Sequence, residues 1–324
     1  MKQINLSFVI PCYRSEASIE EVLNEIEKTV AQRSKYAYEV IAVNDCSPDQ
    51  VLQVLKRRGE ADCRIKILDL AKNSGKHAAL MAGYAYAKGD IIVSVDDDGQ
   101  CPLDRLWELL EPLSQGYDVS LAKYPVKKQS ALKNFGSFIN AKMAQHLLKK
   151  PKELQLSNFS AMKRFVCIEI LRYQNPYPYI DGLFLRTTGR IANVPMEERE
   201  RQIGNTGYTF RKSLNLWLNG FTAFSVLPLR MAILLGLMFS GVGFLFGIWV
   251  VVHKFLTPDI LAGYSSLMAV TLFVSGILMM MLGLIGEYVG RIYISINNSP
   301  QYVIREAVNI GHMQLAEKNH DQKD

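Results

Sequence analysis

Three adjacent carboxylates and an amide, at positions 96–98 and 100, follow a run of β-branched apolar residues. Such a run is typical of a strand inside a parallel sheet, and the ligands of these sheets gather at the carboxyl ends of the strands. Side chains alternate along an extended chain, so Asp96, Asp98 and Gln100 would share one face and Asp97 the other. Three oxygen donors on one face suit a hard cation such as Mg²⁺ or Mn²⁺, whose usual partners would be the phosphates of a bound nucleotide. The alternative is an acidic turn that binds nothing.

Polar residues also follow three earlier predicted strands. They lie at 11–16, 44–49 and 72–77. Because the ends of parallel strands meet at one edge of a sheet, these segments would form a crevice together with the carboxylates. In that crevice Tyr13 could stack on a ring, Asp45 could accept a hydrogen bond from a base or a ribose, and Lys76 could pair with a phosphate. Two alternatives stay open: Asp45 caps the helix that follows it, and Lys76 and His77 lie in a solvated turn.

The elements that must position these residues alternate between strands and helices. The apolar pattern predicts strands at 6–10, 38–43, 65–70 and 91–95, and helices at 18–30, 48–58 and 77–87. A helix at 105–114, a strand at 118–122 and a long helix at 130–148 are expected to follow. This alternation implies a right-handed, mostly parallel, doubly wound α/β sheet. The Gly-x-Gly-x-x-Gly fingerprint of dinucleotide-dependent redox enzymes is absent from the sequence.

Two uncharged apolar stretches, at 231–252 and 264–285, stand out near the C-terminus. Each has the length of about 20 residues that a helix needs to cross about 30 Å of hydrocarbon, so they predict a transmembrane hairpin. The alternative is a pair of buried core helices. Positive residues flank the hairpin (Arg211, Lys212, Arg230, Arg291 and Arg305), whereas its connecting loop carries Lys254. The positive-inside rule then predicts a cytoplasmic N-terminal part, and we expect no signal peptide, because residues 7–11 lie in a short strand-like run without a cleavage pattern.

The chain therefore divides into four predicted parts. They are an N-terminal α/β domain with the predicted crevice at 1–204, an amphipathic interfacial region at 205–230, the hairpin region at 231–290 and a C-terminal tail at 291–324. Within the second part, residues 205–218 are expected to form a helix on the membrane surface. The polar end of the tail, after Leu315, is expected to be disordered.

The composition restricts the classes of partner and of redox chemistry. The net charge is +6, but no basic stripe interleaved with aromatic residues is present, so we predict a membrane surface and phosphate substrates rather than nucleic acid. The five cysteines, at 12, 46, 63, 101 and 167, form no Cys-x-x-Cys pair. We expect them to be reduced residues without a metal-binding or redox role.

Four motifs occur together at the predicted strand ends. They are Ile-Pro-Cys-Tyr at 10–13, Val-Asn-Asp-Cys-Ser-Pro-Asp at 43–49, Asn-Ser-Gly-Lys-His-Ala at 73–78 and Asp-Asp-Asp-Gly-Gln at 96–100. Together they resemble the family 2 glycosyltransferases, which have the GT-A fold. More narrowly, the chain resembles the polyprenyl-phosphate branch, with its dolichyl-phosphate mannose synthases and its undecaprenyl-phosphate glucose and formamido-arabinose transferases. Segments 200–208, 228–230 and 286–293 fit this branch too, and the last is most similar to the formamido-arabinose transferases. The resemblance extends over residues 6–308.

The resemblance implies a GT-A, Rossmann-like domain followed by a two-helix transmembrane hairpin, and it implies roles for particular residues. Asp96, Asp98 and Gln100 would hold Mg²⁺ or Mn²⁺, and Asp96, Asp98 and Asn158 would form the catalytic group. The predicted nucleotide-sugar site comprises Pro11, Tyr13, Glu16, Asp45, Ser47, Gly75, Lys76 and Asp97. The predicted acceptor-phosphate site comprises Lys123, Lys127, Lys133, Ser137 and Arg201. For the lysines, a charged surface facing the membrane is the alternative.

The sequence departs from the family pattern in three places. Asp97 and Gly99 replace apolar residues of the usual Asp-Ala-Asp-Leu-Gln motif, and several arginines of the acceptor site are lysines here. The family segment Gly-Asp-Phe/Tyr appears as residues 157–159, where Asn158 replaces an aspartate often proposed as a base. An amide cannot take up a proton, but a phosphomonoester has a second pKa near 6 and is mostly dianionic at neutral pH. We therefore expect activity without a base, with Asn158 orienting the sugar or the acceptor.

The resemblance implies metal-dependent, inverting transfer of one sugar from a nucleotide sugar, expected to be UDP-linked, to undecaprenyl phosphate. The protein would be a multi-pass protein of the bacterial inner membrane with a cytoplasmic catalytic domain, and it would form a homo-oligomer such as a tetramer. One alternative is a processive polysaccharide synthase, although that class usually has more membrane helices and a Gln-x-x-Arg-Trp motif. Another is a catalytically silent scaffold that binds nucleotide and recruits partners.

Overall fold

The computed structural model describes residues 3–125, 151, 153–197, 199, 263–296 and 300–310, with scattered positions between 234 and 252. Contacts divide the chain into two units, each of which is described by itself. The first, called the sheet unit below, comprises Met1–Thr209 and Asn298–Asp324, and the second comprises Phe210–Asn297.

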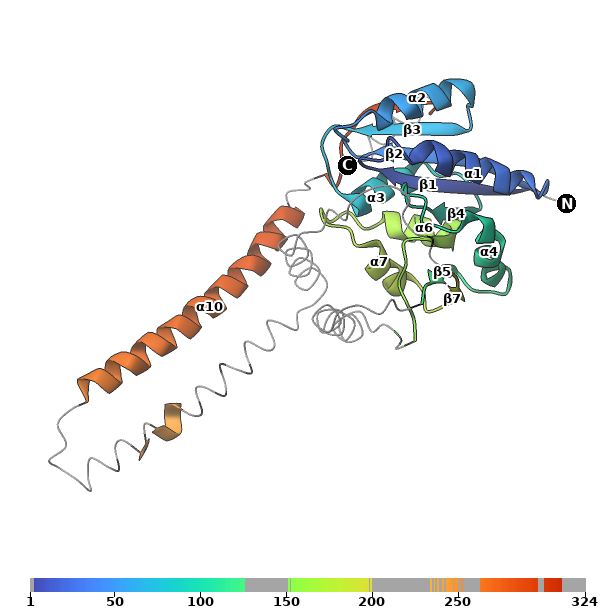
Figure 1. Ribbon diagram of the computed structural model, residues 1–324. Coiled ribbons are helices and arrows are strands. Elements are labelled where there is room, and N and C mark those ends of the chain that lie inside the picture. The colour runs from blue at the N-terminus through green and yellow to red at the C-terminus, as the bar shows by residue number, and fades with distance from the viewer. Residues whose placement is uncertain are drawn as a thin grey trace. The chain divides into compact units, whose positions relative to one another are not determined.

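The sheet unit is built on one eight-stranded sheet with the order β7-β5-β6-β4-β1-β2-β3-β8 (Figure 1). The strands are β1 (Ile4–Cys12), β2 (Tyr36–Asn44), β3 (Ile65–Leu70), β4 (Ile91–Ser94), β5 (Val119–Lys123), β6 (Ser160–Lys163), β7 (Ile191–Pro195) and β8 (Ile304–Val308). Strands β1 to β4 are mutually parallel where they pair, whereas β6 runs antiparallel to β4 and β5, and β8 runs antiparallel to β3. The predicted α/β, Rossmann-like sheet domain is confirmed.

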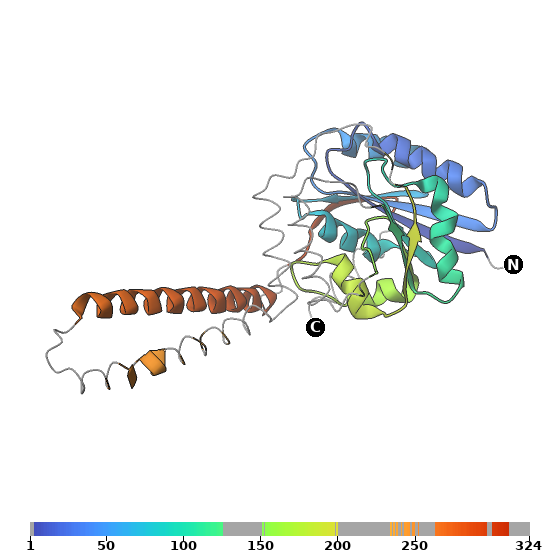
Figure 2. The same cartoon turned by 60° about the horizontal axis from the view of Figure 1, so that its bottom comes forward.

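Helices cover both faces of this sheet (Figure 2). The described helices are α1 (Ile19–Ala31), α2 (Val51–Ala61), α3 (Lys76–Tyr86), the 3₁₀ turn η1 (Leu103–Arg105), α4 (Leu106–Ser114), α6 (Arg164–Leu171), α7 (Ile180–Thr187) and, in the second unit, α10 (Tyr264–Ile296). Side chains alternate along β1, so Phe8 and Ile10 pack with α1, α2 and α4, while Val9 packs with α3, α6 and α7. The sheet is therefore buried on both faces, which is why its central strands read as continuous apolar runs.

Most predicted elements of the first 125 residues are present, with small differences in their ends. Helix α2 begins at Val51 rather than at 48, because Asp49 lies in the preceding turn and its carboxylate accepts hydrogen bonds from Ser47 Oγ and the Val51 amide. The predicted helix at 130–148 lies outside the described residues. Strands β6, β7 and β8 and helices α6 and α7 were not predicted. Strand β8 lies within the segment 291–324, which the sequence analysis treats as a C-terminal tail, and it completes one edge of the sheet.

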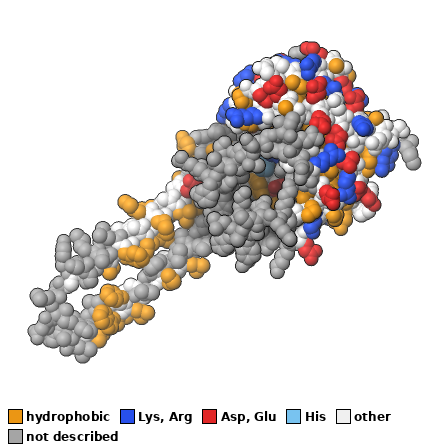
Figure 3. Space-filling view, viewed as in Figure 1, with side chains coloured by type: hydrophobic (Ala, Val, Ile, Leu, Met, Phe, Trp, Pro, Cys, Tyr) orange, Lys and Arg blue, Asp and Glu red, His pale blue; other side chains and the backbone are white. Residues whose placement is uncertain are grey.

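In the second unit, α10 covers the predicted helix at 264–285 and continues to Ile296. Among the described residues, Phe273–Gly290 is the one window that is long and apolar enough to cross a membrane, judged by length and composition. Its large apolar side chains are exposed, as the orange surface in Figure 3 shows. A Cβ atom on Gly236 would lie 3.1 Å from Met281 Cε, so the chain around Gly236 passes close to α10. This close approach agrees with the hairpin, of which the other helix is described only at scattered positions.

Candidate active site

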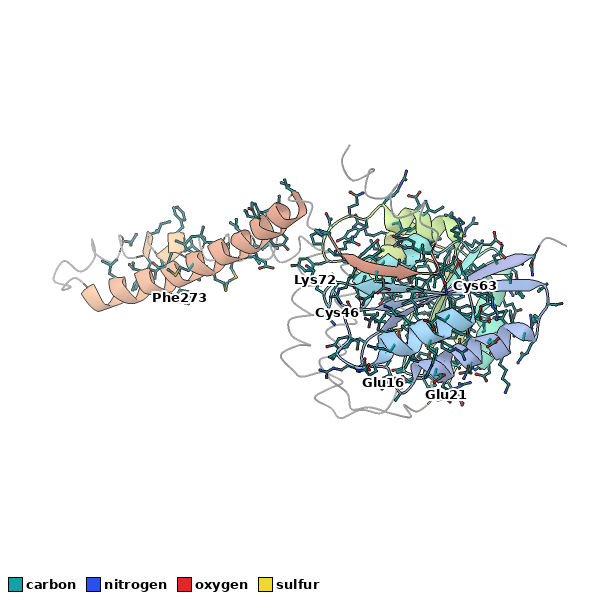
Figure 4. All side chains as sticks on the ribbon, turned by 90° about the horizontal axis from the view of Figure 1, so that it is seen from above. Glu16, Glu21, Cys46, Cys63, Lys72 and Phe273 are labelled. Atoms are coloured by element: carbon teal, nitrogen blue, oxygen red, sulfur yellow. The ribbon has the colours of Figure 1, made fainter. Side chains whose placement is uncertain are left out.

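The loops that follow β1, β2, β3 and β4 lie at the carboxyl ends of four parallel strands, the edge at which such sheets bind ligands. In Figure 4, Cys46 and Lys72, which lie in two of these loops, are at one end of the sheet, and Cys63, which precedes β3, is at the other. The polar segments at 11–16, 44–49 and 72–77 are therefore brought together with the carboxylates at 96–98.

Asp45 is buried and holds the loop after β3. Its two carboxylate oxygens accept hydrogen bonds from the backbone amides of Ser74, at 2.7 Å, and Gly75, at 2.9 Å. Burial raises the pKa of Asp45 above its usual value, and the two amide hydrogen bonds oppose that rise. Gly75 has a φ of 86°, a conformation that side chains disfavour. Asp45 thus shapes the turn in front of α3 and does not cap α2.

Ser47 connects the loops that follow β1 and β2. Its Oγ donates to Asp49 Oδ1 at 2.6 Å and accepts from the Arg14 amide at 2.7 Å. Asp49 also accepts from the amide of Glu16, at 3.0 Å. Arg14 and Cys46 are non-glycine residues with positive φ, at 57° and 50°. Such backbone costs on the order of 1–3 kcal/mol and persists only where its surroundings over-determine it, as these hydrogen bonds do.

Glu16 and Tyr13 occupy the outer part of the same loop. Glu16 Oε2 accepts from the Gln50 amide at 3.1 Å, so this carboxylate joins the loop to the start of α2. Tyr13 is 44% exposed, and the Arg14 guanidinium lies over its ring at 5.6 Å from the ring centre. Pro11, by contrast, is buried within β1. An exposed ring beside buried backbone offers a flat surface on which a planar ligand can stack.

Asp96, which follows β4, contacts side chains from α3 and from the segment before β6. Its carboxylate forms an ion pair with Lys76 Nζ, at the first residue of α3, and accepts from Asn158 Nδ2 at 3.0 Å. Asn158 lies just before β6, 62 positions away in sequence. The structure therefore brings together Asp96, Lys76 and Asn158, and Lys76 is not in a solvated turn.

Asp98 and Gln100 lie in the following turn. Asp98 Oδ1 accepts from the Gln100 amide at 3.1 Å, and Gln100 Nε2 donates to the Arg199 carbonyl at 3.3 Å. Among the described residues, no group of three His, Cys, Asp or Glu side chains converges as a metal cluster. Two carboxylates and an amide oxygen nevertheless fit a hard divalent cation in chemical kind, since Mg²⁺ and Mn²⁺ prefer oxygen ligands. The ion pair of Asp96 with an ammonium group shows that a positive charge is accommodated there.

The Asp97 carboxylate contacts the loop after β1, whereas that of Asp96 contacts Lys76 and Asn158. Asp97 Oδ2 accepts from the Tyr13 amide at 2.9 Å, and its backbone carbonyl accepts from Ser18 Oγ at 2.6 Å. Burial, with added repulsion from Asp96 and Asp98, raises the pKa of Asp97 to about 6. Asp97 therefore fixes the loop after β1 beside the carboxylates.

The predicted acceptor residues are mostly outside the described part of the chain. Lys123 is the last residue of β5 and is exposed. Lys127, Lys133, Ser137 and Arg201 lie outside the described residues. The chain near the last of these approaches the site at Arg199, whose guanidinium pairs with Glu25 and Asp104 and whose amide donates to the Gln100 carbonyl at 3.3 Å.

The sequence analysis assigned no role to His77, which follows Lys76 on α3 and packs against the chain at the start of α7. Its Nδ1 accepts from the Ile180 amide at 3.4 Å, and its ring meets the Tyr179 ring edge-on at 5.2 Å. Burial, assisted by the neighbouring charge of Lys76, lowers the pKa of His77 to about 4. His77 lies within the motif at 73–78, but nothing in the sequence points to its partners, Tyr179 and the first residue of α7, Ile180.

The chain was compared with known families and proteins. Residues 7–171 match Glycosyl transferase family 2, and residues 227–292 match the GtrB C-terminal hairpin. The chain is 33% identical over 323 residues to the uncharacterized glycosyltransferase YkcC of Bacillus subtilis, covering 98% of this chain and 99% of that protein. It is 28% identical over 305 residues to the SfII prophage-derived bactoprenol glucosyl transferase of Shigella flexneri, covering 94% of this chain and 98% of that protein.

A solved structure shares the fold. It is glucosyl-3-phosphoglycerate synthase from Mycobacterium tuberculosis in complex with Mn²⁺, uridine diphosphate and phosphoglyceric acid. The TM-score is 0.51 at 19% identity, and the match covers 68% of this chain and 77% of that one. With a family match over half of the chain and a full-length relative at 33% identity, the protein belongs to glycosyltransferase family 2, and it carries a GtrB-type C-terminal hairpin.

Proposed function

We propose that this glycosyltransferase moves a single sugar from a UDP-linked donor to a polyprenyl phosphate, with undecaprenyl phosphate as the acceptor. The observation that carries the proposal is that the match to bactoprenol glucosyl transferases extends over 94% of the chain, through both the family 2 domain and the hairpin. A chain that carries both an apolar hairpin and a polar crevice suits a reaction whose acceptor tail lies in lipid and whose donor is soluble. The site would then face the cytoplasm at the bacterial inner membrane.

The donor end of the crevice is suited to a nucleotide. Each carboxylate oxygen has two lone pairs, so Asp45 can hold the Ser74 and Gly75 amides and still accept from a uracil N–H. Tyr13 supplies a ring for stacking, and Lys76 places an ammonium group where a diphosphate would lie. Glu16, Ser47 and Asp97 hold the loops that carry these groups, and Pro11 stiffens the end of β1.

Asp96, Asp98 and Gln100 would hold a divalent cation, Mg²⁺ or Mn²⁺, and a bound cation supplies positive charge against the leaving diphosphate. Lys76 contributes a second positive charge from α3. Lys123 and the other predicted acceptor residues, Lys127, Lys133, Ser137 and Arg201, would hold the lipid phosphate by charge and hydrogen bonds. Much of the remaining acceleration would come from positioning the two substrates.

In the proposed reaction a phosphate oxygen of the acceptor forms a bond to the anomeric carbon from the face opposite the nucleotide. The bond from that carbon to the diphosphate oxygen breaks, and the electron pair leaves with the nucleotide. No proton has to be removed from a dianionic phosphate. Asn158, exposed and anchored to Asp96 through Nδ2, orients the sugar or the acceptor with its remaining amide groups.

The absence of a base is directly testable at Asn158. Replacing it by aspartate puts a carboxylate next to Asp96, so we expect turnover to fall rather than rise. A rise of about two orders of magnitude, equivalent to about 2.7 kcal/mol of barrier, would show that the reaction does need a base. Asn158→Gln, which keeps the amide, serves as the matched control.

The donor and acceptor are tested by incubating the full chain in detergent with a panel of radiolabelled UDP-sugars, undecaprenyl phosphate and Mg²⁺ or Mn²⁺. We expect one sugar to enter a lipid that is extracted into organic solvent and is labile to mild acid. A long polymer would instead indicate a processive synthase. UDP binding without transfer to any polyprenyl phosphate would indicate a silent scaffold. The mass of the active particle in the same detergent would decide whether a homo-oligomer such as a tetramer forms.

A further inference from the structure

Strand β8 brings an arginine to the edge of the sheet through a β-bulge. In its antiparallel pairing with β3, Glu306 lies opposite Asp69 and Ile304 lies opposite Leu70, with an irregularity between them. Arg305 is therefore the extra residue of the bulge, with no partner of its own in the register. Bulges bend a strand locally and re-aim a side chain, and they recur beside active sites.

The re-aimed side chain reaches a buried carboxylate. Arg305 Nη1 lies 3.4 Å from Asp69 Oδ2, and Arg305 Nη2 donates to the Ala71 carbonyl at 2.9 Å. Asp69 is only 3% exposed, and a buried carboxylate is costly unless it is paired and hydrogen-bonded. Its other oxygen accepts from Asn44 Nδ2 at 2.7 Å. Arg305 thus supplies the positive charge for a carboxylate at the end of β3.

Asp69 in turn orients Asn44 toward the loop after β2. With its Nδ2 held by Asp69, Asn44 presents Oδ1 to the Ser47 amide, which donates to it at 3.2 Å. Ser47 is the residue whose hydroxyl accepts from the Arg14 amide and donates to Asp49. A continuous set of hydrogen bonds therefore runs from Arg305 to the loops after β1 and β2.

A second branch reaches the loop after β3. The Ala71 carbonyl that accepts from Arg305 lies 3.8 Å from Cys46 Sγ, and the Ala71 amide donates to the Val303 carbonyl at 2.8 Å. Cys46, with its positive φ, directly follows Asp45. The chain after α10 thus contacts the loop after β3 directly, and it reaches the loop after β2 through the contact between Ala71 and Cys46.

We propose that Arg305 is a positioning residue for the donor site, acting through Asp69, Asn44 and the Ala71 carbonyl. Strand β8, which follows the hairpin in sequence, then contributes to donor binding. The bulge serves to direct a guanidinium whose Nη1 and Nη2 contact the Asp69 carboxylate in β3 and the Ala71 carbonyl in the following loop at the same time, a geometry that the single ammonium group of a lysine does not match. The identity of the ligand as a uridine nucleotide rests on the proposed function above. The contacts of Arg305 do not.

The test compares the full-chain variants Arg305→Met and Arg305→Lys with the unaltered protein in detergent, with UDP as the probe in the presence of Mn²⁺. Loss of hydrogen bonds to charged groups is worth about 1.5–3 kcal/mol, so we expect Arg305→Met to weaken UDP binding by about tenfold or more. The KM for the donor should rise by a similar factor, while kcat and the KM for the lipid acceptor stay nearly unchanged. Arg305→Lys should recover part of the loss.

The matched control lies one residue away on the same strand. The Glu306 side chain forms an exposed ion pair with Lys56 at 2.6 Å, and only its backbone is paired with Asp69 in the sheet. Glu306→Gln should leave UDP binding and the donor KM unchanged. The double variant Asp69→Asn with Arg305→Met should lose little more than Arg305→Met alone, because both act through one set of contacts.

Hydrogen exchange of the backbone amides provides a readout that needs no ligand. We expect Arg305→Met to speed exchange at 45–49 and 71–75 and to leave β4 unchanged. If the unaltered protein binds no UDP, the proposed donor class fails, and exchange alone decides the role of Arg305. If UDP binds equally to Arg305→Met and exchange is unaltered, the positioning role fails while the proposed function stands. Equal losses in Arg305→Met and Glu306→Gln would show a general effect on the sheet edge and would also overturn the role.

Discussion

In the sheet unit, Leu6, Phe8 and Ile26 are fully buried, whereas on helix α10 Leu267, Met279 and Leu282 are 68%, 77% and 66% exposed. Leaving apolar surface in water costs about 25 cal/mol per Å², so the two regions cannot be suited to the same solvent. The surface of the sheet unit shows mixed charges, and that of the described part of the second unit shows apolar side chains (Figure 3). The chemistry-bearing groups lie in the first region, and the second is suited to lipid.

The largest expected effect is a loss of sugar transfer without a loss of membrane insertion. Asp96→Asn or Asp98→Asn should reduce sugar transfer by at least about a thousandfold, equivalent to about 4 kcal/mol of barrier, because each removes a charge proposed to hold the cation. Transfer to lipid is measured with labelled donor, and membrane content by sedimentation. Glu108→Gln on α4, which breaks an exposed pair with Arg105 of η1, is the control and should keep full activity. Transfer at the normal rate by either aspartate variant would contradict the proposed cation site.

The next largest effect addresses α10. Leu282→Arg puts a charge on an exposed apolar position and should cost about 2.5–3.5 kcal/mol of insertion free energy at the centre of a bilayer. We expect a smaller fraction of the protein to resist extraction from membranes by alkaline carbonate. The matched change in the sheet unit is Ile168→Arg on α6, where the side chain is 50% exposed and water can solvate the charge. If the two variants resisted extraction equally, α10 would not lie in lipid.

A third prediction concerns a buried group of the sheet unit. The pKa of His77 is lowered to about 4, so the folded protein disfavours the protonated form that the unfolded chain adopts below about pH 6.5. The contribution of neutral His77 to the free energy of unfolding is therefore fully present above about pH 6.5 and is lost as the pH falls toward 4. From pH 7 to pH 5 the unfolding free energy should fall by about 2 kcal/mol more in the unaltered protein than in His77→Asn. Urea unfolding of the sheet unit at both pH values measures this, and identical pH dependence in the two proteins would refute it.

The parts of the fold that were predictable are those with local signals. Strands β1 to β4 are runs of apolar residues bounded by polar loops, and α1 and α3 follow them at regular spacing. In contrast, β6 has the sequence Ser-Ala-Met-Lys and β8 has Ile-Arg-Glu-Ala-Val, which are short and lack a clear apolar pattern. Their conformation is fixed by pairing with β4 and β3, partners that lie far away in sequence.

The same division applies to the candidate site. The motifs at strand ends placed Asp45, Lys76 and Asp96 at one edge, because parallel strands bring their ends together. The contacts between these groups could not be predicted from a single sequence. Asn158 meets Asp96 across 62 positions, and Arg305 meets Asp69 across 236. A single sequence carries no signal for such pairs. The bulge that brings Arg305 to Asp69 depends only on how β8 is aligned with β3 in the sheet.

The smallest expected effect applies one substitution to a glycine in each region. A Cβ atom on Gly83 in α3 would lie 2.3 Å from Val9 Cγ1 and 3.2 Å from Val43 Cγ2, whereas among the described residues no atom lies within 4 Å of a Cβ on Gly283 in α10. Overpacking costs about 1–3 kcal/mol, and alanine gains about 1 kcal/mol over glycine in a helix, so Gly83→Ala should lower the unfolding free energy by a net of about 1 kcal/mol. Gly283→Ala should leave the urea midpoint of the sheet unit unchanged. If Gly83→Ala were as stable as the unaltered protein, α3 would have to move away from the sheet, and the donor KM would then change because Lys76 begins that helix.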